Sequence, residues 1–432
     1  MAFEKLRGRR IQAGELAVVV GAGRSGLAAV RLLLREGARV RLLDSNPEAL
    51  KTENVAALRE QGVELLGGEH KPKYFEGAVF VIPSPGMPVA ALDEYLGAGA
   101  PEIVGEMELA WRCLANEPVL AVTGTSGKTT TVSLAAAMLK AQGYTVFLGG
   151  NIGVPLSEYV LSGDKADVLA LEISSFQLQA CSTFCPRVGV LLNITPNHQD
   201  YHKDMREYVG AKFRLFRCQD EDDLAVFGAD MKAMVRQFSL KAKQVYADKT
   251  DRFTESRLLG AHNKGNQEAA WLACRFLGVS EVNAARAVAE FDPLPHRLEI
   301  VRDTKGILYV NDSKCTTVDS LRVALEAFDR PVRLLCGGKF KGGDLAGLRD
   351  LIGERVAEVA LFGASREIFE NAWQNTIPIT WSAALEPAVR HLAARADEGD
   401  VVLLAPATSS FDLYAGYVER GNDFKRIVEA LS

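Results

Sequence analysis

A chain of 432 residues with 48% hydrophobic and 24% charged residues has the composition of a globular protein, and its length suits about two to four domains. Its net charge of -5 excludes a broad positive field, so we expect no nucleic-acid partner. No run reaches the roughly 18 apolar residues of a membrane-spanning helix, and the early run LAVVV ends in glycines, which predicts a strand rather than a signal peptide. Seven scattered cysteines without zinc-site spacing favour the reducing cytoplasm.

Two strand–loop–helix–strand patterns occupy the first part of the chain. The first begins in LAVVV (16–20), passes a glycine loop, continues as a helix with Leu27, Val30 and Leu34 on one face, and ends in VRLLD. The second repeats this order between 119 and 150, as VLAVTG, the loop GTSGKTTT, a helix that stops at Gly143, and TVFLGG. Both patterns predict βαβ units with parallel strands.

Further short apolar runs predict buried strands, and glycines or small polar residues follow most of them. These runs are DVLALEIS, RVGVLLNIT, VRLLCGG, VALFG and VVLLAPA. Together with the two βαβ units they predict an α/β protein with mostly parallel sheets. Open α/β folds bind ligands at the carboxyl ends of their strands, so we expect the functional residues there.

Two interruptions divide the chain into three predicted domains. A Gly/Ala/Pro-rich stretch at 97–105 precedes the second βαβ unit, and two prolines within 291–299 interrupt a helical region before a new strand pattern, GILYVND. The predicted domains are 1–98, a Rossmann-like domain; 99–295, a central P-loop domain; and 296–432, a second Rossmann-like domain.

The segment GTSGKTT, from Gly124 to Thr130, indicates a phosphate site. A glycine loop between a strand and a helix offers backbone N–H groups and a helix amino terminus to phosphates, with Lys128 as a point charge and Thr129 placed for magnesium. Val122 stands where the full Walker spacing has its first glycine. The alternative is a glycine turn with a solvated lysine.

A second glycine loop, GAGRSG, spans Gly21 to Gly26 and fits GxGxxG. Asp44 ends the next strand about where a dinucleotide fold has its ribose-binding acid. A nicotinamide-dependent oxidoreductase is one reading, although the second half of the chain offers no catalytic set for hydride transfer. The other reading is a loop that receives any diphosphate, including that of a UDP-sugar.

Several polar residues follow the strands of the central domain. Glu172 ends a buried strand, which favours a metal or a positive partner, with a capping glutamate as the alternative. His198 and His202 are four residues apart with Asp200 between them; the spacing suits zinc, but no cysteine or HExxH context accompanies it. We favour a functional role for His198, whereas His202 reads equally well as a structural residue of its loop.

Two later segments carry weaker signals. Lys212 lies between apolar residues in AKFRLF, so we expect a buried stem and a lowered amine pKa. GAHNKGNQEAA resembles a helix entry whose amides, Asn263 and Asn266, suit phosphate or purine contacts.

Taken in order, these motifs resemble the series found in the Mur ligases. The motifs are GTSGKTT, GNIG, LEISSFQL, NITPNHQDYH, GAHNKGN, PHRLE, NDSK, CGGKFKGGD and APATSSFD, and they span most of the chain. The GAGRSG unit, the SPGM segment near Ser84 and the length resemble the D-glutamate-adding member of the family. The resemblance implies an ATP-dependent, ADP-forming ligase that joins D-glutamate to the alanine carboxylate of UDP-N-acetylmuramoyl-L-alanine through an acyl phosphate, in peptidoglycan synthesis.

The resemblance also implies a role for each matching residue. Catalysis would rest on Lys128, Glu172, His198 and Lys212, with two Mg2+ ions served by Thr129, Glu172, His198 and a carbamylated Lys212. ATP would contact Gly124, Thr125, Ser126, Gly127, Lys128, Thr129, Thr130, Asn266, Arg297 and Asp312. The UDP substrate would contact Arg24, Ser25, Ser45, Asn46, Gly86 and Asn151. The amino acid would contact Lys314, Thr316, Lys341, Ser410 and Tyr417, and the choice between Lys339 and Lys341 stays open.

The implied partners are the three small-molecule substrates, with no membrane partner, and the chain is expected to act as a monomer. A related acyl-phosphate ligase such as folylpolyglutamate synthetase is the alternative within the superfamily. An ATP-gated binding protein without ligase turnover is a further alternative.

Overall fold

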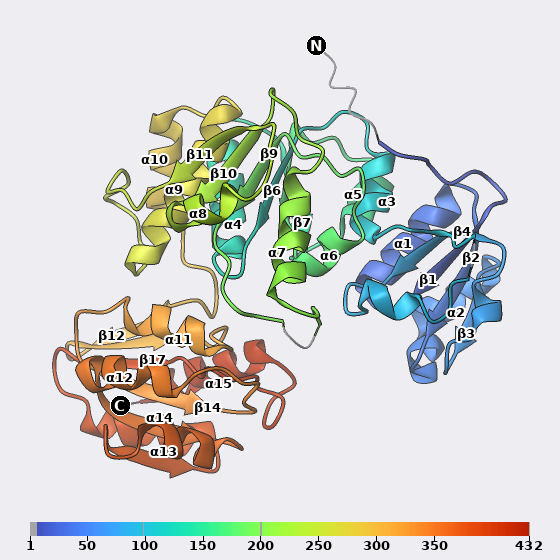
Figure 1. Cartoon of the computed structure of the whole chain (residues 1–432). Helices are drawn as coiled ribbons and strands as arrows, with labels where there is room; N and C mark the ends of the chain where they lie inside the picture. The colour runs from blue at the N-terminus through green and yellow to red at the C-terminus, as the bar shows by residue number, and fades with distance from the viewer. Residues whose placement is uncertain (1–6, 98, 199–200, 432) are drawn as a thin grey trace. The chain divides into compact units, whose positions relative to one another are not determined.

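The computed structural model describes residues 7–97, 99–198 and 201–431 (Figure 1). The chain forms two compact units, residues 1–248 with 266–288, and residues 249–265 with 289–432. Position 98, where the first predicted domain ends, and Asp200 of the predicted histidine loop lie outside the described residues. Among the described residues, no helix combines the length and apolarity that a membrane crossing requires.

The first sheet belongs to the first unit and is entirely parallel, with strand order β3-β2-β1-β4-β5. Its strands are β1 (Leu16–Val20), β2 (Arg39–Asp44), β3 (Glu64–Gly67), β4 (Ala78–Pro83) and β5 (Glu102–Ile103). Its helices are α1 (Arg24–Arg35), α2 (Glu53–Glu60) and the 3-10 turns η1 (Pro47–Lys51), η2 (Pro72–Tyr74) and η3 (Val89–Leu92). Both glycine-loop strands predicted from sequence are present, β1 here and β6 below.

The second sheet also belongs to the first unit, and its six strands are parallel in the order β11-β10-β9-β6-β8-β7. Its strands are β6 (Val119–Thr123), β7 (Val146–Gly150), β8 (Val168–Glu172), β9 (Val188–Leu191), β10 (Leu224–Gly228) and β11 (Lys243–Ala247). The helices of this region are α3 (Glu106–Cys113), α4 (Lys128–Ala141), α5 (Leu156–Ser162), α6 (Ser175–Gln179), α7 (Met205–Phe213), α8 (Lys232–Val235), α9 (Ala261–Phe276) and α10 (Glu281–Glu290), with η4 (Arg214–Phe216) and η5 (Ala229–Met231). The phosphate-loop strand β6 therefore lies between β9 and β8.

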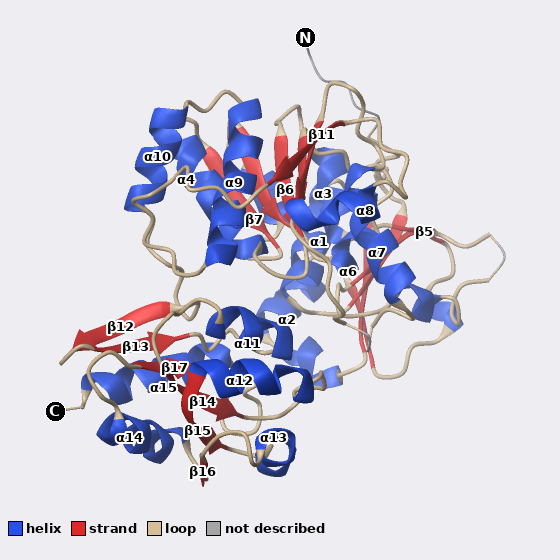
Figure 2. Ribbon diagram, turned by 60° about the vertical axis from the view of Figure 1, so that its left-hand side comes forward, coloured by secondary structure: helices blue, strands red, loops and turns tan. Residues whose placement is uncertain are grey.

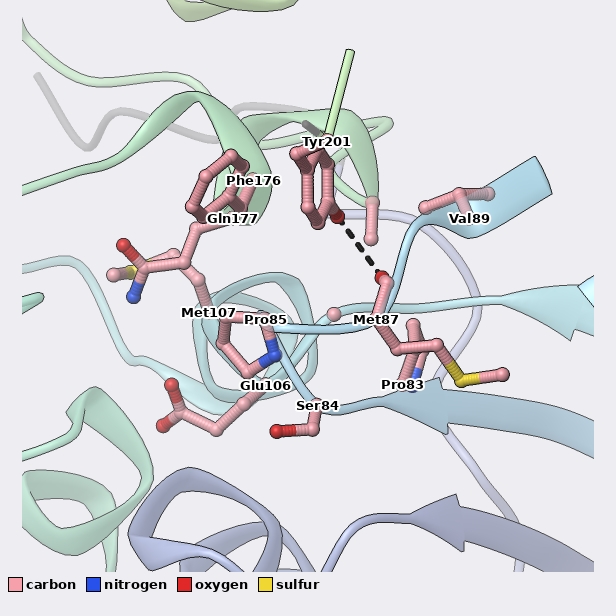
Figure 3. Close-up of a pocket in the computed structure, with 12 residues that line it drawn as sticks. Pro83, Ser84, Pro85, Met87, Val89, Glu106, Met107, Phe176, Gln177 and Tyr201 are labelled. Carbon is pink, nitrogen blue, oxygen red and sulfur yellow. Dashed lines mark hydrogen bonds between the residues drawn. The ribbon is translucent and has the colours of Figure 1, made fainter. Parts of the chain in front are cut away.

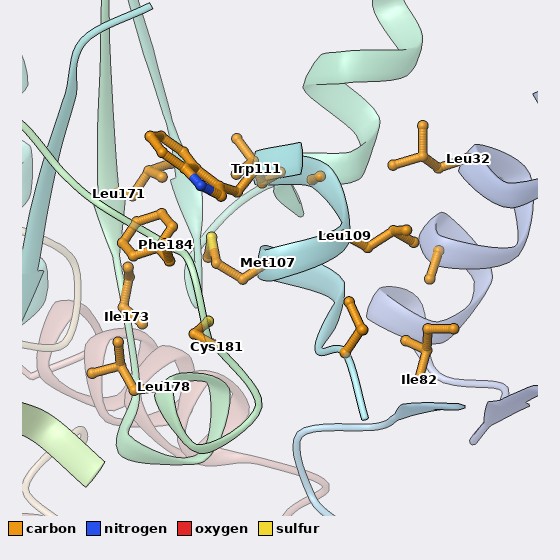
Figure 4. Packing of buried hydrophobic residues seen from close by; sticks show 14 of the residues in the cluster. Leu32, Ile82, Met107, Leu109, Trp111, Leu171, Ile173, Leu178, Cys181 and Phe184 are labelled. Carbon is orange, nitrogen blue, oxygen red and sulfur yellow. The ribbon is translucent and has the colours of Figure 1, made fainter. Parts of the chain in front are cut away.

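One hydrophobic core joins the first two sheets. It contains Leu32 of α1 and Ile82 of β4 as well as Leu171 of β8, and α3 contributes Leu109 and Trp111 between them (Figure 4). Helix α1 also packs directly against α3 and α5. Because burying apolar area is the main favourable term in folding, this shared core holds the two sheets in one unit.

A buried carboxylate on α3 also stabilises the contact between the first two sheets. Glu108 is fully buried, and its carboxylate accepts hydrogen bonds from the backbone N–H of Thr183 at 3.0 Å and of Phe184 at 2.9 Å. Its Oε1 also lies 2.9 Å from Nε of Arg112, which is itself buried. A buried carboxylate is tolerated only when it is paired in this way.

The third sheet forms the second unit, in the order β12-β13-β17-β14-β15-β16. Its strands are β12 (Glu299–Thr304), β13 (Ile307–Asn311), β14 (Val332–Gly337), β15 (Val356–Phe362), β16 (Ile379–Ser382) and β17 (Val401–Leu404). Its helices are α11 (Val318–Leu325), α12 (Arg349–Arg355), α13 (Arg366–Trp373), α14 (Leu385–Arg395) and α15 (Tyr417–Glu429), with η6 (Ala346–Leu348). Only the edge strand β12 is antiparallel among these paired strands.

Helices cover both faces of this third sheet (Figure 2), which explains the continuous apolar strands. Successive residues of β14 point to opposite faces: Leu334 packs with α11, α12 and α13, whereas Leu335 packs with α14 and α15. The predicted α/β fold with mostly parallel sheets is confirmed. The domain ranges 1–98, 99–295 and 296–432 stay predictions.

Candidate functional site

The segment GTSGKTT forms a loop at the carboxyl end of β6, and α4 begins at its lysine. Gly124 has φ 152° and Gly127 φ 83°, conformations that side-chain-bearing residues rarely adopt. Gly127 is the N-cap of α4, and a Cβ atom there would lie 2.5 Å from Oδ1 of Asn266. The loop therefore brings Asn266, predicted to bind ATP, against the helix amino terminus that suits phosphate.

The segment that follows β9 shapes this loop. Asn193 accepts a hydrogen bond from the Thr125 backbone N–H at 3.0 Å, and its side chain bonds both the N–H (2.9 Å) and the carbonyl (3.2 Å) of Ser126. The Thr125 hydroxyl lies 3.0 Å from the Tyr208 hydroxyl and accepts from the Thr195 N–H at 3.0 Å. The predicted site residues did not include Asn193, Thr195 or Tyr208, although NIT follows a strand that could have been paired with the phosphate-loop strand.

Glu172 lies at the centre of a polar cluster at the carboxyl end of β8. Its side chain is buried, Oε2 accepts from the Thr129 hydroxyl at 2.7 Å, and Oε1 accepts from Nδ2 of Asn151 at 2.8 Å. The alternative reading of Glu172 as a capping residue is wrong, because Ser174 caps α6 in a capping box with Gln177. The structure thus brings together Thr129, Glu172 and Asn151, which belong to three separate motifs.

Two lysine amines meet at the start of the phosphate loop. Lys128 donates to the carbonyls of Gly124 (3.0 Å) and Thr125 (2.9 Å), and Lys212 of α7 donates to the Gly124 carbonyl at 2.9 Å. Lys212 is only 1% exposed. Burial holds the pKa of its amine well below the ordinary lysine value, and the charge of Lys128 lowers it further, while Glu172 opposes the shift. The predicted buried stem and lowered pKa are confirmed.

His198 and His202 have different surroundings. His198 is exposed and has φ 56°, and its ring lies edge-on to Phe176 with centroids 4.7 Å apart. His202 is buried, with Nε2 2.9 Å from the Ser175 hydroxyl and Nδ1 3.3 Å from Nε2 of Gln179. These contacts support the structural reading of His202. Within the described ranges, no group of three or more His, Cys, Asp or Glu side chains could hold a metal ion.

Five of the six residues predicted for the UDP substrate lie at one edge of the first sheet, and the sixth, Asn151, follows β7 of the second sheet. The two oxygens of Asp44 accept from the backbone N–H groups of Ala22 (2.7 Å) and Asn46 (2.9 Å), so this carboxylate already fixes the glycine loop. Because both oxygens of Asp44 already accept backbone hydrogen bonds, the structure does not support Asp44 as a ribose ligand. A Cβ on Gly21 would lie 2.7 Å from Cβ of Ser84, which places the SPGM segment on the GAGRSG loop. The predicted contacts here are Arg24, Ser25, Ser45, Asn46 and Gly86, all exposed or half-buried.

In the second unit, a buried arginine of α15 joins three other motifs. Arg420 of α15 is completely buried, and its guanidinium donates to the carbonyls of Ser313 (2.8 Å) and Thr408 (3.2 Å). It also reaches the Gly337 carbonyl at 3.5 Å. Burial lowers the pKa of Arg420 to about 10. NDSK, CGGKFKGGD, APATSSFD and α15 therefore share one hydrogen-bonding residue, which the sequence predictions did not include.

The predicted residues of this unit lie on those motifs. Asp312 is buried and accepts from the Leu298 N–H at 3.3 Å, and burial raises its pKa to about 7, opposed by the charge of nearby Arg297. The amine of Lys314 lies 3.9 Å from the ring centroid of Tyr417. Thr316 and Tyr417 are half-buried, Ser410 is buried, and Lys339 and Lys341 are both exposed.

Comparison with known protein families defines the class of this chain. Three family models match it: "Mur ligase MurD-like, N-terminal domain" over residues 15–103, "Mur ligase middle domain" over 122–258, and "Mur ligase, glutamate ligase domain" over 296–408. The chain belongs to the Mur ligase family.

Curated relatives narrow the comparison within that family. A UDP-N-acetylmuramoylalanine--D-glutamate ligase of Desulfovibrio desulfuricans is 71% identical, and the match covers 100% of both chains. A protein of the same name from Nitratidesulfovibrio vulgaris strain DP4 is 61% identical, again over 100% of both chains. This chain is therefore similar, over its whole length, to ligases of that name.

Solved structures of distant relatives share the fold. The MurF ligase of Thermotoga maritima in complex with ADP matches with a TM-score of 0.60 and 22% identity, covering 98% of both chains. A folylpolyglutamate synthase of Mycobacterium tuberculosis complexed with ADP matches with a TM-score of 0.58 and 14% identity, over 74% of this chain and 92% of that one. At these identities the likeness concerns the fold alone.

Proposed function

We propose that this chain is an ATP-dependent ligase that joins D-glutamate to the alanine carboxylate of UDP-N-acetylmuramoyl-L-alanine. One observation carries the proposal: Lys128, Thr129, Glu172 and Lys212 form a single cluster at the phosphate loop, in a chain 71% identical over its whole length to a ligase of that name. The substrate comes from the relative's name, and the cluster supplies the chemistry.

The phosphate loop is assigned to ATP. The helix amino terminus at Gly127 and the amine of Lys128 offset the negative charge of the β- and γ-phosphates. Asn266 is assigned to adenine on the strength of its motif, and its side chain lies against Gly127 of the phosphate loop. Arg297 and Asp312 of the second unit are assigned to phosphate and ribose on the strength of their motifs alone.

The donor set fits magnesium. Mg2+ prefers oxygen ligands, and the Thr129 hydroxyl and the Glu172 carboxylate are joined at 2.7 Å beside the phosphate loop. We assign two Mg2+ ions to these residues, to His198 and to a carbamylated Lys212. When bound, the ions would neutralise phosphate charge during transfer.

Carbamylation of Lys212 is supported by its buried amine. Burial lowers the pKa of this amine, which favours its uncharged form, and the uncharged amine is a nucleophile. Its nitrogen would bond to the carbon of CO2 and release one proton to water, which leaves a carbamate anion. This reaction turns an amine whose protonated form is repelled by Lys128 into an anion that Lys128 attracts.

The reaction then needs positioning and charge stabilisation rather than a nucleophilic side chain. An oxygen of the alanine carboxylate attacks the γ-phosphorus of ATP, ADP leaves, and an acyl phosphate forms. The amine nitrogen of D-glutamate attacks the acyl carbon, loses a proton, and expels phosphate as the amide forms. Lys128 stabilises the charge of the first step, and the acyl phosphate must be kept from water because it would be hydrolysed.

The carboxylates of glutamate are assigned to the second unit. Lys314, Thr316, Lys341, Ser410 and Tyr417 supply two cations and three hydroxyls, which suit a substrate with two carboxylates. Arg420 would act on this pocket by holding the loops that carry Lys314 and Ser410. We keep Lys341 as the glutamate contact and Lys339 as its alternative.

A folylpolyglutamate synthetase activity is the second candidate, because such an enzyme shares the fold. The match to a UDP-N-acetylmuramoylalanine--D-glutamate ligase covers the whole chain, including GAGRSG, and favours the first candidate.

The test is ATP-dependent phosphate release with UDP-N-acetylmuramoyl-L-alanine and D-glutamate, L-glutamate or no amino acid, with product masses measured. A mass gain of one glutamate with D-glutamate alone is expected. Release with a folate and glutamate, and none with the UDP substrate, would overturn the proposal.

A further inference from the structure

The SPGM segment forms a tight turn that lies on the first glycine loop. The Met87 N–H donates to the Ser84 carbonyl at 2.9 Å, which closes the turn, and the Ser84 N–H donates to the carbonyl of Val20 at 2.7 Å. A Cβ atom on Gly21 would lie 2.7 Å from the Ser84 Cβ, so turn and loop are in close contact. A shift of this turn would therefore move the glycine loop as well.

Tyr201 holds the outer side of the turn. Its hydroxyl donates to the Met87 carbonyl at 2.9 Å, across a pocket lined by the turn and by Glu106, Phe176 and Gln177 (Figure 3). Its ring packs on Phe176 with centroids 3.9 Å apart. Burial raises the pKa of Tyr201 to about 12, so the hydroxyl stays a neutral donor at working pH.

The same residue is tied to His198. The backbone N–H groups of Tyr201 (3.1 Å) and His202 (2.9 Å) both donate to the His198 carbonyl. Phe176, on α6, contacts the rings of His198 and Tyr201, and His202 is anchored 2.9 Å from the Ser175 hydroxyl. Tyr201 thus connects the SPGM turn to the segment that carries a predicted catalytic histidine.

We propose that Tyr201 is a positioning residue for the UDP-linked substrate. Its hydrogen bond to the Met87 carbonyl fixes the position of the turn that carries the exposed Gly86. The glycine loop in contact with this turn is thereby held in a fixed position relative to His198. The acceptor carboxylate is then presented to the phosphate loop in one geometry. This inference rests on the proposed function and adds a residue that lies outside the predicted contacts with ATP and the amino acid.

The test compares Tyr201→Phe with Tyr144→Phe. Tyr144 belongs to the same unit, and its hydroxyl donates to the Leu277 carbonyl at 3.0 Å, so both variants lose one tyrosine–carbonyl hydrogen bond. Steady-state kinetics are measured for each substrate of the full-length protein, with thermal unfolding of both variants.

We expect Tyr201→Phe to raise KM for the UDP substrate about three- to ten-fold, the size of one neutral hydrogen bond, with KM for ATP and for D-glutamate unchanged. Tyr144→Phe should leave all three unchanged. An unchanged KM for the UDP substrate in Tyr201→Phe, or an equal rise for every substrate, would overturn the assignment of Tyr201. A wild-type chain that does not convert the UDP substrate at all would instead overturn the proposed function.

Discussion

Replacing Gly127 by alanine tests whether the phosphate loop needs its observed backbone. The residue combines φ 83° with a crowded environment, since an added Cβ would lie 2.5 Å from Oδ1 of Asn266 and 3.0 Å from Cδ1 of Leu192. Gly143, just after the other end of α4, has φ 100° but no atom within 4 Å of an added Cβ. Gly143→Ala therefore introduces backbone strain but no steric clash, which makes it the matched control.

The two variants should differ by the cost of the clash. A left-handed conformation costs a non-glycine residue roughly 1–2 kcal/mol, which is the expected loss for Gly143→Ala. Forcing an extra carbon into a packed site costs about 1–3 kcal/mol more, so Gly127→Ala should lose about 2–5 kcal/mol of unfolding free energy. Rotation of the Asn266 side chain or movement of the loop would relieve the clash, and either would displace groups assigned to ATP, so ATP should bind at least about tenfold more weakly.

Urea unfolding gives the two stabilities, and calorimetric titration with ATP gives the two affinities. Gly143→Ala is expected to keep the parent affinity for ATP. The reasoning is refuted if Gly127→Ala is no less stable than Gly143→Ala and binds ATP as the parent does.

Three further predictions concern buried charges. Glu108→Gln should lower the unfolding free energy by about 3–5 kcal/mol because it breaks a buried pair; a loss below about 1 kcal/mol in urea unfolding would contradict this. The pKa of Asp312 is raised to about 7, so the stability it contributes is present below the ordinary carboxyl value near 4 and is lost as pH rises through 7. Asp312→Asn should therefore stabilise the chain more at pH 8 than at pH 5, and equal thermal shifts at the two pH values would speak against it. Lys212→Ala should be inactive and regain part of its turnover with formate, whereas full activity without formate would refute the carbamate assignment.

The sequence predicted the fold well where patterns are local. The apolar runs and glycine loops placed β1, α1, β6 and α4 correctly, because strand length, helix periodicity and glycine stops are properties of neighbouring residues. The predicted pKa shift of Lys212 also followed from its apolar neighbours in AKFRLF.

The sequence could not predict contacts that depend on tertiary pairing. Asn193 acts on Ser126 because β9 pairs with β6, and that adjacency is a property of the sheet order. Arg420 joins loops more than 80 residues distant from it in sequence, such as that of Gly337, and a single buried arginine has no local signature. Asp44 ends its strand where a dinucleotide fold has its ribose-binding acid, but position alone cannot reveal that backbone N–H groups already use its carboxylate.

The core shared by the first two sheets determines which parts of this chain can unfold or be exchanged independently. Three family models match it, yet the apolar cluster around α3 is continuous from Leu32 to Leu171. Scanning calorimetry should then resolve at most two cooperative transitions, because segments that share a core melt together. For a protein engineer, the exchangeable module at the amino-terminal end is the whole first unit, because a chimera cut near residue 98 would expose the packed faces of α1 and α3 to water. The second unit has its own core and is therefore the better candidate for exchange between relatives.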